Sequence, residues 1–421
     1  MGILSTIAFF LVLPPVLYIL NSFLTSDPEP ILGTYSQRGR WFGLKYWIFY
    51  LMFRLRKRQG AAKKGKTLES QQGAVGYGMA LFEKVEDMDK AQPLPPAYFF
   101  PKAVDAVYFN GSNKDGVYVV TAIARRQNQM ANVLTYLVLP GIGVLQLPDN
   151  PGTLLEDCDP DKHSVGGLCI ESVKPMKEWK ISYHGKMRLV DAKKQDWTNG
   201  KLLEVNMELR WTALTTYFDF DTDLDASLMA DTIAREKWSK QFFDELKRSH
   251  QTHHEQFGKM TGAVEVEGHA KQEIVVVGMR DHSYGNYRDW NEIHRYAIHM
   301  LHLEDGTCIH AGKICYPGRL SCLTTGYVMR PGDYKVTLTH STFDMVSTGE
   351  DTWKIPDQYK FSFVCGRERF DCEVKVKVAP MFYMGKDREA KLYEGFVDVI
   401  VNGKKGWGIA EYCYHNREKK T

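Results

Sequence analysis

The feature that most constrains the fold is a long succession of short, strand-like segments. From about residue 98 onward, apolar and β-branched runs are separated by turn residues such as Gly, Asn, Asp and Pro. In residues 371–378, Cys and Val alternate with Glu and Lys, which is typical of a strand with one buried and one wet face. Strands are predicted over residues 106–109, 117–124, 133–139, 179–190, 202–213, 262–268, 272–277, 295–303, 307–313, 334–339, 359–365, 371–378, 393–401 and 406–412.

One stretch with helical periodicity divides this succession. Within residues 227–248, four apolar residues recur every fourth position and would share one face of a helix. They are Ala234, Trp238, Phe242 and Leu246. That face favours packing against a core or another domain.

The order of elements predicts a mainly β protein. A chain of 421 residues is long enough for two or three domains, and strand-rich halves of about 150 residues lie on both sides of the helix. We expect two antiparallel β-barrels or sandwiches packed together. The first would cover residues 69–226, the linking helix residues 227–256, and the second residues 257–421.

The chain begins with an apolar segment. Residues 2–24 carry no charge and are long enough for a membrane span at about 1.5 Å per residue. Pro14 and Pro15 lie in the middle, where they would kink a helix or mark a membrane wedge. A cleaved signal peptide is the alternative, but no Lys or Arg precedes the apolar run. We expect a transmembrane or wedge-like anchor over residues 1–26.

An aromatic segment and a basic linker follow the predicted anchor, over residues 27–68. Residues 41–53 are rich in Trp and Tyr, which suits the interface between lipid and water, although a second span stays open. The basic run 54–58 favours the cytosolic side, where anionic lipids attract it. We therefore expect the lipid bilayer as a partner, in the endoplasmic reticulum or another endomembrane, with the folded body facing the cytosol.

The positive charge of the chain is local. Residues 38–66 contain ten Lys and Arg and no acid, whereas the formal net charge is +3. The remainder therefore carries 3 − 10 = −7. This distribution argues against nucleic acid as a partner.

Several kinds of chemistry lack their sequence motifs. The eight cysteines include no Cys-x-x-Cys pair, and the 13 histidines fit no zinc-ligand spacing. A phosphate-binding glycine motif and a Gly-x-Ser-x-Gly elbow are also missing. We accordingly expect no cofactor and no metal ion.

Residues 278–290 hold the densest group of reactive side chains, directly after the apolar run 274–277. A carboxylate and a histidine, Asp281 and His282, stand side by side at the end of this predicted strand. Facing an apolar cavity, such a pair can be tuned into a general acid or base. Arg280 would orient Asp281 or Asp289 by a double hydrogen bond. A purely structural corner is the alternative.

The sequence resembles a known superfamily in the order of its motifs. They are His254-Glu255-Gln256, Gly278-x-Arg280-Asp281-His282-Ser283-Tyr284-Gly285, Arg288-Asp289-Trp290, and Gly406-x-Gly408 with Glu411. This order is similar to that of the double-lipocalin superfamily, which includes carotenoid 1,2-hydratases, AttH-type proteins, fungal Diels-Alderases and survival factors that handle ceramide. The nearest resemblance is to a branch with an Arg-Asp-His-Ser-Trp-Gly signature. In this chain Tyr284 stands where that signature has Trp.

The resemblance implies two lipocalin-like barrels with an apolar pocket. It places Asp281 and His282 at the site as the acid and base. Further ligand-binding residues are expected at Arg280, Tyr284, Tyr287, Arg288, Asp289, Trp290 and Glu411.

Three functions remain open from the sequence. The first is membrane-anchored binding of a hydrophobic small molecule, such as a lipid, a ceramide-like molecule or an isoprenoid. The second is a hydratase, isomerase or cyclase that uses Asp281 and His282, and the third is a membrane-tethered scaffold. The oligomeric state is also open.

Overall fold

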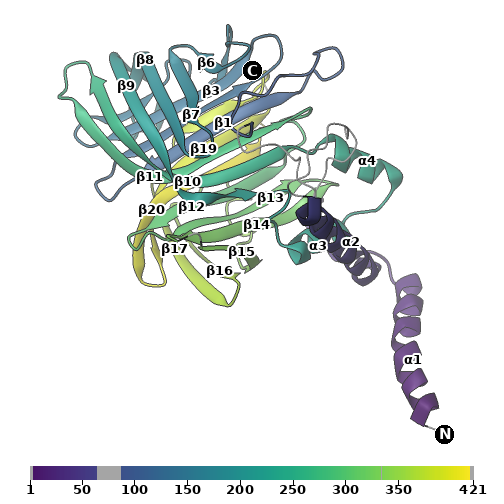
Figure 1. Ribbon diagram of the computed structural model, residues 1–421. Helices are drawn as coiled ribbons and strands as arrows, with labels where there is room; N and C mark the ends of the chain where they lie inside the picture. Colours follow the sequence, from purple (N-terminus) through teal and green to yellow (C-terminus); the bar gives the residue numbers. More distant parts are fainter. Residues whose placement is uncertain (1–2, 64–86, 333, 418–421) are drawn as a thin grey trace.

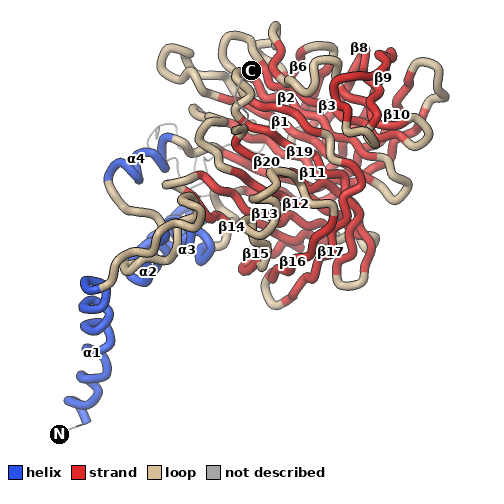
Figure 2. The backbone as a smooth tube through the Cα atoms, turned by 180° about the vertical axis from the view of Figure 1, so that it is seen from behind, coloured by secondary structure: helices blue, strands red, loops and turns tan. Residues whose placement is uncertain are grey.

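The computed structural model describes residues 3–63, 87–332 and 334–417 (Figure 1). Within these residues most of the chain forms antiparallel strands, as predicted, and four helices lie to one side (Figure 2). The elements are α1 (Ile3–Leu24), α2 (Phe42–Lys63), β1 (Val104–Ser112), β2 (Tyr118–Arg125), β3 (Ala131–Leu139), β4 (Gly143–Gln146), β5 (Leu154–Leu155), β6 (His163–Val165), β7 (Leu168–Lys174), β8 (Glu178–Asp191), β9 (Asp196–Asp219), α3 (Ala226–Arg235), α4 (Lys240–Arg248), β10 (Thr252–Val266), β11 (Gln272–Gly285), β12 (Arg295–Leu303), β13 (Cys308–Tyr316), β14 (Leu320–Arg330), β15 (Tyr334–Ser341), β16 (Gln358–Cys365), β17 (Glu368–Val378), β18 (Met381–Met384), β19 (Ala390–Val401) and β20 (Lys404–His415).

The strands form two antiparallel sheets. The first has the order β4-β3-β2-β1-β11-β10-β9-β8-β7-β6, and an additional β4–β8 pairing closes eight of these strands into a barrel. The second has the order β17-β16-β15-β14-β13-β12-β20-β19-β18, with an additional β17–β19 pairing. The two sheets lie against each other (Figure 1).

Three hydrophobic clusters follow from the alternation of side chains along the strands. Val107 and Phe109 of β1 belong to a cluster enclosed by the first barrel, together with the buried Trp211. A second cluster belongs mainly to the other sheet, and Tyr35 from the segment before α2 packs into it. Tyr108, between Val107 and Phe109, points the other way, into a cluster shared by both sheets. The contact between the sheets is therefore itself a hydrophobic core.

The sheets divide the chain later than expected. The second strand-rich half was predicted to begin at residue 257, but β10 pairs with β9 and β11 pairs with β1. Both strands therefore complete the first barrel, and the chain enters the second sheet only with β12. Residues 278–285 belong to β11, the last strand of the first sheet in chain order, whereas they were expected near the start of the second strand-rich half.

The linking helix is also divided in two. The predicted helix over residues 227–248 breaks between α3 and α4, where the Ser239 hydroxyl caps α4 by accepting a hydrogen bond from Phe242 N. Trp238 lies in the break, and its indole donates to Ile233 O. The fourfold apolar spacing continued across this cap, which is why periodicity alone predicted a single helix.

A predicted turn is strand in the structure. The strands predicted over residues 106–109 and 117–124 leave 110–116 between them as a turn, but Asn110 and Gly111 lie inside β1 and are buried. A Cβ on Gly111 would come within 2.6 Å of Val276. The glycine thus serves close packing of β1, and the turn begins after Ser112.

Two helices precede the sheets. Phe49 and Phe53 of α2 are buried in the cluster shared by both sheets, whereas α1 projects from the body (Figure 1). Across the described ranges 3–63, 87–332 and 334–417, neither α1 nor another helix combines the length and apolar character needed to cross a membrane. The membrane span predicted over residues 1–26 is therefore not confirmed.

Candidate functional site

A cavity of about 310 Å³ lies between the two sheets. Apolar side chains from both sheets form most of its wall, and a smaller set of acids, histidines and arginines interrupts them. The apolar lining includes Ala106, Ala122, Ala124, Leu134, Met279, Ile298, Met300, Leu323, Phe382, Met384 and Leu392. The polar lining includes His253, Glu255, Asp281, Ser283, Arg288, His310 and Glu411.

Strand alternation decides which side chains of β11 reach this cavity. Met279, Asp281 and Ser283 line it, whereas Arg280 and His282 point to the opposite face, into the first barrel. The two residues expected to act together, Asp281 and His282, are thus separated by the sheet itself. Neighbours in one strand cannot both face one cavity unless a bulge intervenes, and β11 has none here.

Asp281 is the polar group most available to a ligand. Its carboxyl lines the cavity, and none of the residues that the structure describes donates a hydrogen bond to it. Burial raises the pKa of Asp281 above its usual value, and the nearby Glu255 charge acts in the same direction. A neutral carboxylic acid in an apolar cavity can donate a proton to a bound molecule.

Glu255 lies opposite Asp281 in the β10–β11 register and is held firmly. Its Oε2 accepts a hydrogen bond from the Tyr327 hydroxyl at 2.6 Å and lies 2.8 Å from His310 Nδ1. Its Oε1 lies 3.0 Å from His253 Nε2. Burial opposes ionisation, but His310 and His253 hold the pKa of Glu255 well below its usual range. Glu255 is therefore an anion, whereas the neighbouring Asp281 keeps its proton to a higher pH than an ordinary aspartate.

Both histidines that contact Glu255 also line the cavity. Burial alone would lower the pKa of His253, yet the hydrogen bond to Glu255 and the charge of Asp281 raise it. The His310 Nε2 atom is buried and has no hydrogen-bond partner among the described residues. Two imidazoles thus supply proton-exchanging groups near Asp281.

A second pair of acids faces these groups from the other sheet. Glu394 and Glu411 are directly opposite each other in the β19–β20 register. Burial and the neighbouring Glu411 raise the pKa of Glu394 well above its usual value, and burial raises the pKa of Glu411 as well. Two adjacent buried carboxyls cannot both ionise without large repulsion, so they share a proton. The Tyr296 hydroxyl donates to Glu411, and Tyr108 donates to Glu394 at 3.1 Å.

The loop after β11 forms one end of the cavity. Tyr287, Arg288, Asp289 and Trp290 line it, as their predicted ligand-binding role requires. Arg288 is held by Ser283 Oγ at 2.7 Å, while Asp289 pairs with Lys102. The half-buried Glu292 and Arg319 pair nearby, 2.6 Å apart. Ion pairs therefore surround an apolar interior at this end.

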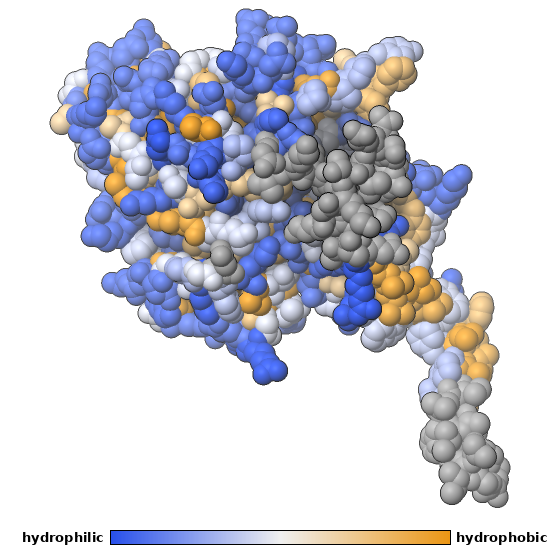
Figure 3. All heavy atoms as spheres, viewed as in Figure 1, coloured by the Kyte–Doolittle hydropathy of each residue, from blue (hydrophilic) through white to orange (hydrophobic). Residues whose placement is uncertain are grey.

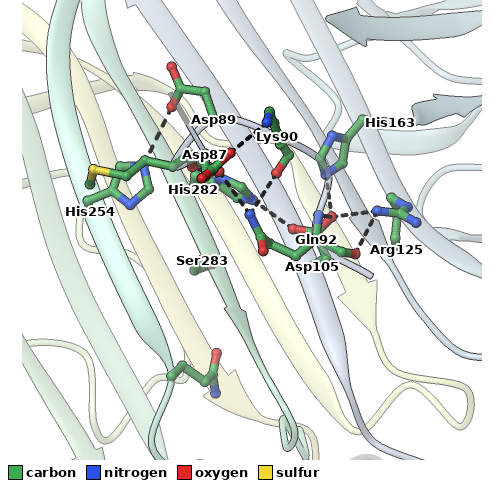
Figure 4. Close-up of polar contacts among 12 residues, drawn as sticks. Asp87, Asp89, Lys90, Gln92, Asp105, Arg125, His163, His254, His282 and Ser283 are labelled. Carbon is green, nitrogen blue, oxygen red and sulfur yellow. Dashed lines mark hydrogen bonds and ion pairs between the residues drawn. The ribbon is translucent and has the colours of Figure 1, made fainter. Parts of the chain in front are cut away.

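His282 belongs to a separate buried network inside the first barrel (Figure 4). Its Nδ1 lies 2.7 Å from Met88 O, and its Nε2 lies 2.7 Å from Asp105 Oδ1. The other Asp105 oxygen contacts Arg125 at 2.6 Å and His163 at 3.0 Å. Both ring nitrogens of His282 are occupied by oxygen partners, so this side chain fastens residues 88–105 to β11.

Arg280 also differs from its expected role. It pairs with Asp89 at 2.8 Å, where Asp281 or Asp289 was expected, and donates to Gln256 at 2.9 Å. The guanidinium also lies 5.5 Å from the ring of Trp179. Tyr284 is buried beside His282, with ring centroids 5.0 Å apart, and is not part of the cavity wall.

Two groups of residues in this network could hold a metal ion. They are Asp89, His254 and His282, and Asp105, His163 and His282. In each group a guanidinium already contacts the carboxylate, Arg280 in the first and Arg125 in the second. A positive side chain at that place opposes a second cation, so the residues fit a paired network better than a metal site.

Sequence reasoning missed His253, His310 and Glu394, and it used Glu255 only as part of a motif. The alternation rule could have found His253, because it lies two positions from Glu255 on one strand and therefore faces the same side. Their partner strand places Asp281 opposite Glu255. The contributions of His310 and Glu394 depend on how the second sheet packs, which no local pattern reveals.

Comparison with known proteins shows the family and several structures of related shape. The model of a family of unknown function, DUF8627, matches residues 10–414. A candidate AttH protein of Nitrosomonas europaea is 12% identical, with a TM-score of 0.45, over 77% of this chain and 97% of that one. Kievitone hydratase of Nectria haematococca is 14% identical, with a TM-score of 0.45, over 83% and 96%. CghA is 10% identical, with a TM-score of 0.44, over 76% and 90%.

AttH-type proteins are among the relatives that the sequence resemblance named. At these identities and TM-scores the three structures say nothing about the activity of this chain. No curated protein matches the sequence.

Proposed function

Because the chain belongs to the family of unknown function DUF8627, its function has to be inferred from its own residues, and we propose that it binds a hydrophobic small molecule between its two sheets. The observation that supports this is the cavity of about 310 Å³ with a mainly apolar wall and a few convergent polar groups. Sites for small ligands have this composition and a size of roughly 300–1,000 Å³. A lipid or an isoprenoid with one polar end fits such a wall.

Filling the cavity tests this proposal. Ala122→Phe places a large ring in the wall formed by Ala106, Ala124 and Leu134, so the variant should lose binding of a polarity-sensitive naphthalene dye. Native mass spectrometry should also show the loss of any lipid that purifies with the unmodified protein. Val275→Phe is the matched control, because Val275 is 49% exposed on β11 and away from the cavity.

A contrary result would be equal dye and lipid binding by Ala122→Phe, the control and the unmodified protein. Absence of any bound lipid or dye in the unmodified protein would instead favour the scaffold function.

A second function is favoured by one specific observation: the carboxyl of Asp281 lines the cavity, accepts no hydrogen bond from the described residues and has a raised pKa. We propose that the protein isomerises, hydrates or cyclises its unsaturated ligand by proton transfer, with Asp281 as the acid. Glu255 and the Glu394–Glu411 pair accept or return protons nearby. General acid catalysis of this kind contributes about 10²–10⁴-fold to a rate.

Deuterium labelling tests the catalytic proposal without a known product. The protein is incubated in D₂O with the lipid that it carries, and carbon-bound deuterium is measured by mass spectrometry. We expect incorporation with the unmodified protein and a loss of about 10²-fold or more with Asp281→Asn, while dye binding persists. His282→Gln serves as a comparison, since His282 does not reach the cavity. Equal incorporation by Asp281→Asn and the unmodified protein would exclude Asp281 as the acid.

A further inference from the structure

The helix α2 has two faces with different environments. On one face, Phe49 and Phe53 are 4% and 1% exposed and pack into the cluster between the sheets. On the same side, Lys45 Nζ donates to Glu236 O at 2.7 Å and Lys57 Nζ donates to Leu224 O at 2.8 Å. These contacts fix the rotation of α2 about its own axis.

The opposite face of α2 is apolar and uncovered by the described residues. Its members are 48–59% exposed and recur at spacings of three and four residues, so they form one stripe. This outer face of α2 consists of Leu44, Trp47, Ile48, Leu51 and Leu55. Hydrophobic residues gather over α2 and the adjoining end of α1 in Figure 3, beside the more polar body.

Basic side chains accompany the outer face of α2. Residues 38–58 contain seven Lys and Arg and no acid. Arg54, Arg56 and Arg58 are exposed next to Leu55. An apolar stripe with interfacial Trp and flanking arginines matches the boundary of a bilayer that contains anionic lipid. A protein partner would not need this uniform sign of charge.

The anchored end of α2 lies beside the cavity. Lys57 bonds to the backbone of Leu224, and the side chains of Leu224 and Phe220 are part of the cavity wall. A surface that contacts α2 therefore lies close to that part of the wall. Apolar molecules are concentrated in a bilayer rather than in water.

We propose that the outer face of α2 lies flat on an anionic bilayer and that the cavity takes up its apolar ligand from that bilayer. Binding in the interface plane requires no membrane-spanning helix. The uptake step rests on the proposed small-molecule binding, whereas the docking of α2 does not.

Vesicle flotation with the full chain tests the docking. We expect binding to phosphatidylcholine vesicles that contain phosphatidylserine, and weaker binding at high salt. Replacing Arg54, Arg56 and Arg58 by Gln should weaken this binding by about 100-fold, at close to fivefold for each charge. Trp47→Ser with Leu51→Ser should weaken binding to both kinds of vesicle. The matched control is Val275→Ser with Ile400→Ser, which removes two apolar side chains of 49% and 45% exposure elsewhere.

Two outcomes contradict the docking: equal flotation of the α2 variants and the control, or equal binding to vesicles with and without phosphatidylserine. Uptake is measured separately, as transfer of the naphthalene dye from loaded vesicles. We expect the Trp47→Ser, Leu51→Ser variant to bind free dye normally but to acquire vesicle-loaded dye at least tenfold more slowly. Normal transfer by this variant would overturn uptake from the bilayer. Binding of free dye by Ala122→Phe tests the cavity separately, because free dye reaches the protein without a vesicle.

Discussion

The two faces of β11 and its neighbour β10 use similar residues for different purposes. Toward the barrel interior, Arg280 pairs with Asp89 and His282 pairs with Asp105. Toward the cavity, Asp281 has no hydrogen-bond partner among the residues that the structure describes. A satisfied buried network stabilises a fold, whereas an unsatisfied acid in a cavity is costly unless it serves a ligand.

The histidines of β10 show the same contrast. Burial and the Arg280 charge lower the pKa of His254, on the interior face, to about 3. On the cavity face, the pKa of His253 is raised by Glu255 and Asp281 despite burial. Adjacent residues thus acquire opposite properties because the strand places them in opposite surroundings.

The largest expected effect is on the interior side. Arg280→Met removes the charge but keeps much of the volume, and it leaves the buried Asp89 without its ion-pair partner. The free energy of unfolding should fall by about 3–5 kcal/mol in urea denaturation. Arg210→Met is the control, since Arg210 pairs with Glu178 at the surface and should change stability by less than about 1 kcal/mol. Similar losses in both variants would remove the distinction between the faces.

The pH dependence of stability should separate the two histidines. Because the folded pKa of His254 is about 3 and its usual value is 6.5, its contribution is present above pH 6.5 and is lost as pH falls toward 3. His254→Gln should reduce this acid-side loss by on the order of 3 kcal/mol. His253→Gln should act with the opposite sign, because a raised pKa gives stability that is lost as pH rises. Measurement is by urea denaturation from pH 4 to 8.

His184→Gln is the control substitution, because His184 lies at the surface, where it contacts Glu208. Profiles of equal shape for His253→Gln and His254→Gln would contradict the assignment of opposite environments.

A smaller effect is expected at the contact between the sheets. Tyr108→Phe removes the 3.1 Å hydrogen bond to Glu394 without altering the ring. Because burial and Glu411 raise the pKa of Glu394 well above its usual value, the lost bond is one to an uncharged acid, and the loss should be about 1 kcal/mol, measured by thermal and urea unfolding. A loss of about 3 kcal/mol or more would mean that Glu394 is ionised and depends on Tyr108.

The smallest expected effect is on stability at the cavity face. Asp281→Asn should change the free energy of unfolding by no more than about 1 kcal/mol at neutral pH, although it abolishes proton donation. The raised pKa of Asp281 means that its contribution is present at low pH and is lost as pH rises through the folded value. The variant should therefore be the more stable protein at high pH. Destabilisation comparable to Arg280→Met would make Asp281 structural.

Much of the fold was predictable from local pattern. Alternation and turn residues predicted the strands, and the apolar spacing of Ala234 to Leu246 predicted helix, although Ser239 divides it. Partner choice was not predictable, since β10 and β11 look like ordinary strands whichever sheet they join. The chain was for this reason divided at residue 257, before the strands that complete the first barrel.

The site was also predictable only in part, because local sequence does not show which side chains face the cavity. Residue type and order drew attention to residues 278–290, and Asp281, Tyr287, Arg288, Asp289, Trp290 and Glu411 do line the cavity. The pairing of Asp281 with His282 failed because neighbours on a strand face opposite sides.

The sequence by itself determined the alternating strands, the segment 278–290 and the local positive charge of residues 38–66, because each depends on residues close together in the chain. Only the tertiary structure decided which carboxyls are paired. Asp89 and Asp105 reach Arg280 and His282 from more than a hundred residues away, and Glu411 meets Asp281 only when two sheets pack together. Burial and charge at such long-range contacts set the pKa values, so the chemistry of the site is a property of the packed sheets.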